Sequence, residues 1–234
     1  MLYTPTPRTS YRPLRLRLNG VNLRGTLSIP SEPRALVVIP NGSGDSIYAP
    51  SNEHVASHLR DHGFATLDVD LLSTEEARTD AETSELRFDL PLIAQRLLDV
   101  SEWANNEPGM RGLNHGYFAA GLTAATALIA AAERPFRLRA VVCRGARTDL
   151  ALGVLGLVRA PTLLLAGERD SAHLQANRSA IAALPFSSRL EVISGGGHLL
   201  DDQWAVEFVA ERAGEWFGRT LTRAPAAAPD LLAV

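Results

Sequence analysis

The stretch NHGYFAAGLTAATALIAAAE, residues 114 to 133, decides the fold. It opens with a short, mostly apolar run of the length of a buried strand, and it continues with a segment long enough for a helix. Gly121 lies between the two parts. We therefore expect a strand over 114 to 120, a sharp turn at Gly121 and a helix over 122 to 133.

The same rhythm of apolar run, loop and helical pattern recurs on both sides of this stretch. The other runs are ALVVIP at 35 to 40, FATLDVD at 64 to 70, LRAVVC at 138 to 143, TLLLAG at 162 to 167 and LEVIS at 190 to 194. Buried strands that alternate with helices are typical of a mostly parallel sheet with helices on both faces. The sequence therefore predicts an α/β fold of this kind.

Two strands of a different type precede the parallel part. Residues 14 to 19 and 21 to 29 largely alternate apolar and polar side chains, and they flank the dipeptide Asn19-Gly20. This dipeptide tolerates the positive φ angles of a tight hairpin turn. We expect the chain to open with an antiparallel ribbon.

Helix signals lie between the predicted strands. Pro50 and Ser51 lie near the start of a helix that Gly63 closes, and Asp89 is placed to cap another helix that has Pro91 in its first turn. The polar and charged residues 72 to 88 lie before this second helix and contain few core candidates. We expect them to form a loop or a short helix at the surface, where they can border a pocket.

The length and composition indicate one domain. The chain has 234 residues, of which 46% are hydrophobic, and a formal net charge of −3 with scattered basic residues. Such a chain can bury one large core, and it shows no basic face for nucleic acid and no apolar run of about 18 residues for a membrane. We expect a single domain over residues 1 to 218 and a loosely ordered tail over 219 to 234.

Cys143 is the single cysteine in the sequence. It cannot form an internal disulfide or a cysteine-based zinc cluster, so we expect a reducing, cytoplasmic location and no metal or other cofactor. The expected partner is a small-molecule ligand or substrate, and a homo-oligomer or a protein partner stays open. A cysteine at the end of a buried strand is best interpreted as an inert, small apolar residue.

Three predicted loops carry the candidate functional residues. The sequence NGSG, with Asn41, Gly42 and Ser43, follows the strand at 35 to 40; Asp170 and His198 follow the strands at 162 to 167 and 190 to 194. Ligands of parallel sheets bind beyond the carboxyl ends of the strands. We expect NGSG to form an anion or oxyanion site, with a simple tight turn as the alternative.

An acid followed by a histidine after the last two strands is the chain order of a hydrolase triad, in which the nucleophile comes first. The nucleophile is expected in a G-x-S-x-G motif between strand and helix, where this chain reads Ala119-Ala120-Gly121-Leu122-Thr123. Glycine adopts the strained turn freely but has no side chain. Gly121 therefore preserves the turn and deletes the nucleophile.

Over roughly residues 12 to 218 the chain resembles the dienelactone-hydrolase-like branch of the α/β-hydrolases. The similar segments are NGSG, FATLDVDLLSTEE, GYFAAGLTAATAL, VVCRGARTDLA, APTLLLAGERD and GGGHLL. The family segment resembles GYFGASTGAAAAL, which aligns Gly121 with the serine and Ala119 and Thr123 with the two glycines, and the family's HGSG has histidine in place of Asn41. The resemblance implies the α/β-hydrolase fold, a dyad of Asp170 and His198, and an oxyanion loop that includes Leu122.

Several of these residues have a second interpretation. Asp170 is also placed to cap a helix that starts near Ser171, and it can do so while it orients His198. The Thr123 hydroxyl is expected to bond a backbone carbonyl rather than to attack a substrate. Arg144 and Arg147 either hold their loop through Asp149 or bind an anionic ligand, and the sequence does not decide between the two.

Three functions follow from these residues. The first is a hydrolase-derived protein without serine chemistry that binds a small molecule or a protein partner. The second is an enzyme such as a lyase, isomerase or cyclase that uses Asp170 and His198 as a general base without a covalent intermediate. The third is an ester or lactone hydrolase with a displaced nucleophile, for which the candidates are Ser43, Thr123 and Cys143.

Overall fold

The computed structural model describes residues 9–42, 49–134 and 138–222. These residues form an eight-stranded sheet with the order β1-β2-β4-β3-β5-β6-β7-β8, in which β3 to β8 run parallel and β1 and β2 antiparallel. The strands are β1 (Ser10–Leu18), β2 (Val21–Ile29), β3 (Ala35–Asn41), β4 (Phe64–Asp70), β5 (His115–Ala120), β6 (Ala140–Arg144), β7 (Thr162–Gly167) and β8 (Arg189–Ile193). The predicted α/β fold is confirmed, and each predicted strand exists.

The hairpin between β1 and β2 turns at Asn19 and Gly20, as predicted. Both residues have positive φ angles, 47° and 83°. This conformation gives a two-residue turn the twist that matches its flanking strands. The ribbon then joins the parallel part because β2 pairs antiparallel with β4.

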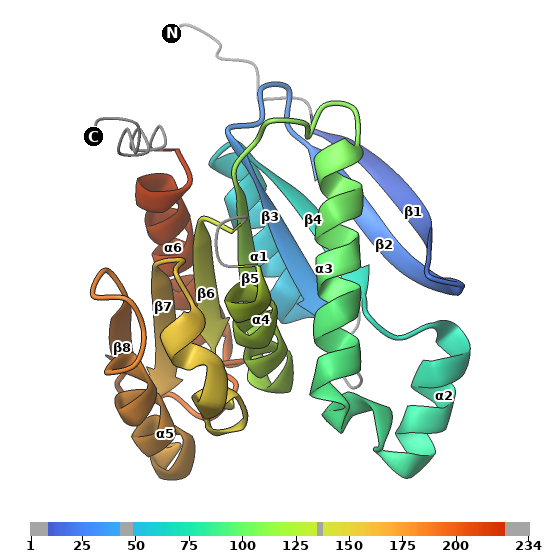
Figure 1. Cartoon of the computed structure of the whole chain (residues 1–234). Coiled ribbons are helices and arrows are strands. Elements are labelled where there is room, and N and C mark those ends of the chain that lie inside the picture. Colours follow the sequence, from blue (N-terminus) through green and yellow to red (C-terminus); the bar gives the residue numbers. More distant parts are fainter. Residues whose placement is uncertain (1–8, 43–48, 135–137, 223–234) are drawn as a thin grey trace, which may run out of the picture.

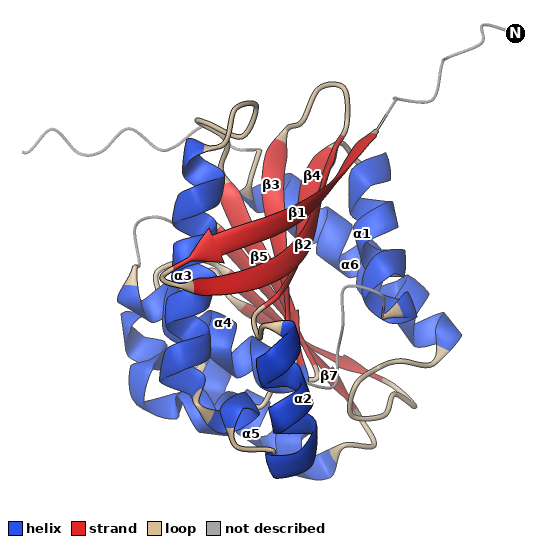
Figure 2. Ribbon diagram, turned by 90° about the vertical axis from the view of Figure 1, so that its right-hand side faces the viewer, coloured by secondary structure: helices blue, strands red, loops and turns tan. Residues whose placement is uncertain are grey.

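Helices cover both faces of the sheet (Figures 1 and 2). One face carries α1 (Pro50–Asp61) and α6 (Gln203–Thr220), and the other carries α3 (Leu90–Asn106), α4 (Gly121–Glu133) and α5 (Ser171–Ile181). The 3₁₀-helix η2 (Thr148–Leu157) packs between α4 and α5. The strands are apolar on both sides because both of their faces are covered, as parallel strands require.

The core consists of two apolar layers, one on each side of the sheet. In β3, Leu36 and Val38 belong to the layer under α3 and α4, whereas Val37 and Ile39 belong to the layer under α1 and α6. This division follows from the alternation of side chains along a strand. None of the described helices combines the length and the apolar composition needed to cross a membrane.

Residues 72 to 88 form helix α2 (Thr74–Thr83) and the short 3₁₀-helix η1 (Leu86–Phe88), one of the two predicted alternatives. Ser73 and Glu76 form a capping box at the start of α2, which satisfies backbone N–H groups that a helix start leaves free. Arg87 of η1 donates to the fully buried carboxylate of Asp80 at 2.9 Å. The contact between Arg87 and Asp80 holds η1 against α2.

The end of the described chain lies in α6. This helix runs past residue 218 to Thr220, and residues 223–234, most of the predicted tail, lie outside the described residues. Asp89 caps α3 as predicted, since its side chain accepts a hydrogen bond from the backbone N–H of Leu92 at 3.1 Å. The same end of α3 lies beside α2 and borders the candidate site (Figure 1).

Candidate functional site

The turn at Gly121 has the geometry of a nucleophile elbow. Ala120 ends β5 in extended conformation, and Gly121 begins α4 with a φ angle of +54°, in the left-handed region that glycine adopts without strain. A Cβ atom at Gly121 would lie 3.2 Å from Cδ2 of Leu199, the neighbour of His198. Position 121 therefore faces the loop after β8 that carries His198, called the histidine loop below. Glycine has no side-chain atom that could react there.

Asp170 and His198 lie in direct contact beyond the ends of β7 and β8. The distance from His198 Nδ1 to Asp170 Oδ2 is 2.5 Å. Burial alone would raise the pKa of Asp170. The hydrogen bonds from His173 and His198 lower this pKa by more, so it lies below its usual range. Asp170 is also the N-cap of α5, so the same carboxylate caps the helix and contacts His198.

The histidine loop rests directly on the ends of two strands because glycines leave room for it. Gly145, just after β6, has a φ angle of +54°, and a Cβ atom there would overlap the carbonyl oxygen of His198. At the end of β7, a Cβ atom on Gly167 would overlap the carbonyl oxygens of Gly196 and Gly197. These two glycines set the position of His198 relative to the elbow.

A cavity of about 330 Å³ adjoins the elbow and the histidine. Its wall includes Gly121 and His198, and Phe88 and Ile93 contribute apolar surface from η1 and α3. Small-molecule sites commonly have such volumes and combine apolar walls with a few polar groups. The polar segment 72 to 88 thus borders a pocket, as the sequence predicts, through Arg87 and Phe88.

The predicted oxyanion loop is reached only in part by this cavity. Gly42 and Leu122 line it, but the Asn41 side chain does not: it is 1% exposed, and its Oδ1 accepts a hydrogen bond from Asn52 at 2.7 Å. The polar atoms of the Asn41 side chain are thus engaged inside the fold, and the predicted oxyanion role of the loop's backbone N–H groups stays a prediction. Ser43 lies outside the described residues.

Thr123 lines the cavity next to Gly42. A Cβ atom at Gly42 would lie 2.8 Å from Thr123 Oγ1, so the threonine fills the space beside the loop. Within the described residues its hydroxyl makes no hydrogen bond to a backbone carbonyl, which corrects the prediction. The Cys143 thiol is fully buried, and burial raises its pKa far above the usual range, as expected for an inert cysteine.

The two arginines after β6 have separate roles. Arg147 binds Asp149 through Nη2 at 2.8 Å and also lines the cavity, which agrees with the first of the two predicted alternatives. Arg144 is 2% exposed and donates from Nη2 to Asn52 Oδ1 at 3.1 Å. The side chain of Arg144 thus reaches back to α1, and the two alternatives predicted for this residue stay predictions.

Sequence reasoning missed His173. Its Nδ1 lies 2.8 Å from Oδ1 and 2.9 Å from Oδ2 of Asp170, and its ring stacks on that of His198 with centroids 4.3 Å apart. A signal was present in the sequence: residues three apart lie on the same side of a helix, so a helix that starts at Ser171 brings His173 back to its own cap. Asp170 thus holds two imidazoles.

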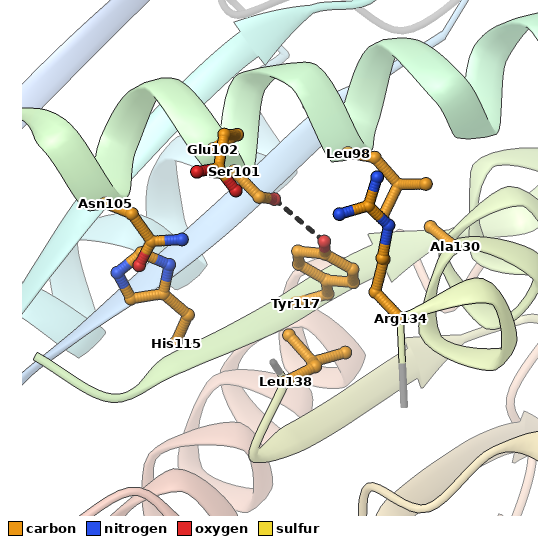
Figure 3. Close-up of a pocket in the computed structure, with 9 residues that line it drawn as sticks. All are labelled: Leu98, Ser101, Glu102, Asn105, His115, Tyr117, Ala130, Arg134 and Leu138. Atoms are coloured by element: carbon orange, nitrogen blue, oxygen red, sulfur yellow. Dashed lines mark hydrogen bonds between the residues drawn. The ribbon is translucent and has the colours of Figure 1, made fainter. Parts of the chain in front are cut away.

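A second cavity lies at the opposite end of β5, on the side of α3 (Figure 3). It measures about 30 Å³ and is lined by His115, Tyr117 and Ser101, of which the last two share a hydrogen bond of 2.8 Å. This volume suits a water molecule or two rather than a substrate. The candidate site is therefore the cavity beside Gly121 rather than this one.

His115 makes unfolding depend on pH. It is 4% exposed, and burial lowers its pKa from 6.5 to about 4. The folded chain favours the neutral ring. The stability of the folded chain is therefore highest above pH 6.5, and it decreases as the pH falls toward 4, because the unfolded chain binds the proton more readily. We expect the free energy of unfolding to fall by about 2 kcal/mol more between pH 7 and 5 than in His115→Gln. Urea denaturation at both pH values measures this change, and an equal change in the two proteins would contradict the prediction.

The sheet order, the elbow and the contacting acid and histidine define an α/β-hydrolase. In comparisons with solved structures, an esterase of Pyrococcus furiosus has a TM-score of 0.72 at 15% identity, covering 91% of this chain and 92% of its own, which reflects the shared fold. The dienelactone hydrolase of Anabaena variabilis has a TM-score of 0.88 at 40% identity, covering 91% and 99%. The chain belongs to the dienelactone-hydrolase-like branch of the α/β-hydrolase superfamily.

The sequence comparisons add a relative that is more than twice as long as the part it shares with this chain. A Mycobacterium tuberculosis protein, named provisionally as a phosphoribosyl transferase, is 44% identical over 197 residues. This match covers 84% of the present chain but only 44% of the relative, so the chain spans less than half of that protein's length. No protein-family model matches the chain.

Proposed function

We propose that this protein binds a small molecule in the cavity beside Gly121 and performs no acyl transfer through a serine. The observation that carries the proposal is the elbow: Gly121 keeps the φ angle of +54° and faces the cavity, but it has no hydroxyl. The scaffold for ligand binding is retained, whereas the atom that would form an acyl-enzyme is absent from its position.

Of the three candidate substitute nucleophiles, the two that lie within the described residues have little support. Cys143 is fully buried, and a thiol whose pKa is raised by burial is a poor nucleophile. Thr123 is 6% exposed, and among the described residues no hydrogen bond joins its hydroxyl to His198, the base that would activate it. These observations favour binding without covalent chemistry.

The cavity wall suggests the class of ligand. Phe88, Ile93 and Leu122 offer apolar surface, while Arg147 and His198 offer hydrogen-bond donors. Such a wall suits a compact molecule with an apolar body and an anionic or carbonyl oxygen. The provisional name of the mycobacterial relative adds phosphoribosyl compounds to the molecules that merit testing.

A pair of phenylalanine variants tests the proposed cavity. Phe88 lines it although the side chain is 57% exposed, so Phe88→Ala removes ligand contacts without opening the core. We expect about tenfold weaker binding of hits from a set of aromatic carboxylates, esters, lactones and phosphoribosyl compounds, measured by ligand-observed NMR. Phe186→Ala is the matched control because Phe186 is fully exposed and outside the cavity. Equal effects of the two changes would contradict the assignment.

A second candidate function is general-base catalysis on a bound molecule. It is favoured by the 2.5 Å contact between His198 and Asp170, together with the place of His198 in the cavity wall. If a ligand is turned over, His198→Ala should lower the rate by about 100-fold or more, whereas the exposed control His54→Ala should not. Binding without turnover, unaffected by either change, would exclude this candidate.

A further inference from the structure

Asp170, His173 and His198 form a compact cluster of ligand-type atoms at the carboxyl end of the sheet. One atom from each side chain, a carboxylate oxygen and two imidazole nitrogens, lies within 4.8 Å of the other two. The Nδ1 atoms of both histidines point at the same carboxylate, at 2.5 Å for His198 and 2.8 Å for His173. Three side chains, two from the start of α5 and one from the loop after β8, thus converge on one point.

An acid that only orients a catalytic base needs one imidazole, and here it holds two. The start of α5 fixes the second: Asp170 is the N-cap, and the backbone N–H of His173 also lies 3.5 Å from its Oδ1. The two rings stack at an interplanar angle of 29°, which restricts both of them. The proposed small-molecule site gives no role to His173, so the second imidazole calls for a different explanation.

We propose that Asp170, His173 and His198 bind one divalent transition-metal ion of the Zn²⁺ type. Two imidazole nitrogens and one carboxylate oxygen are ligands that Zn²⁺ and its neighbours in the first transition row accept. Around Zn²⁺ with bonds of about 2.0 to 2.1 Å, tetrahedral ligand atoms lie about 3.3 Å apart. The imidazole nitrogens now lie 2.5 to 2.9 Å from the carboxylate oxygens of Asp170, and small side-chain shifts would widen these distances to that value.

Exposure and charge at the cluster are compatible with such an ion. The side chains of His173 and His198 are 27% and 39% exposed, against 12% for Asp170, so solvent reaches the cluster from the imidazole side. The nearby cation Arg147 is neutralised by its ion pair with Asp149. An ion here would displace the protons that the imidazoles share with Asp170, and its fourth position would be open to water or to the ligand in the adjacent cavity.

The chain contains a matched control for this site. The rings of His58 in α1 and of His62 at its C-cap also lie close together, tilted by 30° with centroids 4.3 Å apart, but His62 Nδ1 lies 2.8 Å from the carbonyl oxygen of His58 rather than from a carboxylate. His62→Ala therefore removes an exposed histidine from a close pair of imidazoles that lacks the carboxylate ligand. His173→Phe preserves the stacking on His198 while it removes the ligand nitrogen.

The test titrates ZnCl₂ into chelator-treated, tag-free protein by calorimetry, with bound zinc counted by elemental analysis and folding checked by circular dichroism. We expect one ion per chain, affinity lowered at least about 100-fold in His173→Phe and His173→Ala, and no change in His62→Ala. Failure of the wild type to retain zinc, or equal affinity in His173→Phe and the wild type, would overturn the proposal. Neither outcome bears on the Phe88 test, which reports the small-molecule cavity alone.

Discussion

Replacing Gly145 by alanine should destabilise the protein by about 3 kcal/mol or more and displace the histidine loop. Gly145 has a φ angle of +54°, which strains any residue with a Cβ atom, and that atom would overlap the carbonyl oxygen of His198. The obstacle is backbone rather than the tip of a flexible side chain, so a whole loop must move. The melting temperature should fall by roughly 6 to 12 °C.

The control is Gly153→Ala in η2, where an added Cβ atom meets no heavy atom within 4 Å. This change should stay within about 0.5 kcal/mol of the wild type. Urea denaturation measures both variants, and the imidazole NMR signals of His198 report whether its contact with Asp170 survives. If Gly145→Ala is as stable as Gly153→Ala and keeps those signals, strand-end glycines do not set the histidine position.

The strands could be predicted from the sequence because their signals are local. Apolar runs bounded by turn residues put most strand ends within one residue of their observed positions. The largest difference is in β1, expected over 14 to 19 and found at Ser10–Leu18; β6 follows, expected over 138 to 143 and found at Ala140–Arg144. Asn19-Gly20 and Asp89 acted as predicted because a turn conformation and a helix cap depend on neighbouring residues alone. Polar segment 72 to 88 carried no core pattern, so its form as α2 and η1 stayed open.

The candidate site could be predicted only where strand order determines it. Asp170 and His198 follow β7 and β8, which are adjacent, so chain order brings them to one edge. Asn41, Arg144 and His173 depend on contacts between side chains: Asn52 of α1 bonds the first two, and the cap of α5 brings the third to Asp170. Those contacts arise from tertiary packing, which no local pattern in the sequence specifies.

Gly121→Ser should create at most a weak esterase, with turnover below about 1 per second. A serine must adopt the left-handed conformation at a cost of about 1 to 3 kcal/mol. Its Cβ atom would lie 3.2 Å from the Leu199 side chain, which can yield because the contact is a terminal methyl group. Ester hydrolysis in a stopped-flow assay measures the gain over the wild type, which should show none.

The flanking residues provide the comparison for this change. Thr123 fills the space beside Gly42, and Ala119 is bulkier than the glycine of the family motif, so both can shift the new hydroxyl. A displacement near 1 Å can cost about a hundredfold in rate. The triple variant with Ala119→Gly and Thr123→Gly should therefore exceed Gly121→Ser. Turnover of about 1 to 1000 per second in the single variant would show that the flanks are tolerated.

The most direct test of the vacant elbow is intact-mass spectrometry of the wild-type protein after incubation with a fluorophosphonate probe. Serine hydrolases form a covalent adduct with such probes through the activated serine, and Gly121→Ser serves as the comparison in which a hydroxyl is present. The wild type, with glycine at position 121, is expected to keep its unmodified mass. Stoichiometric addition of one probe to the wild type would contradict the account, and the labelled peptide would identify the nucleophile.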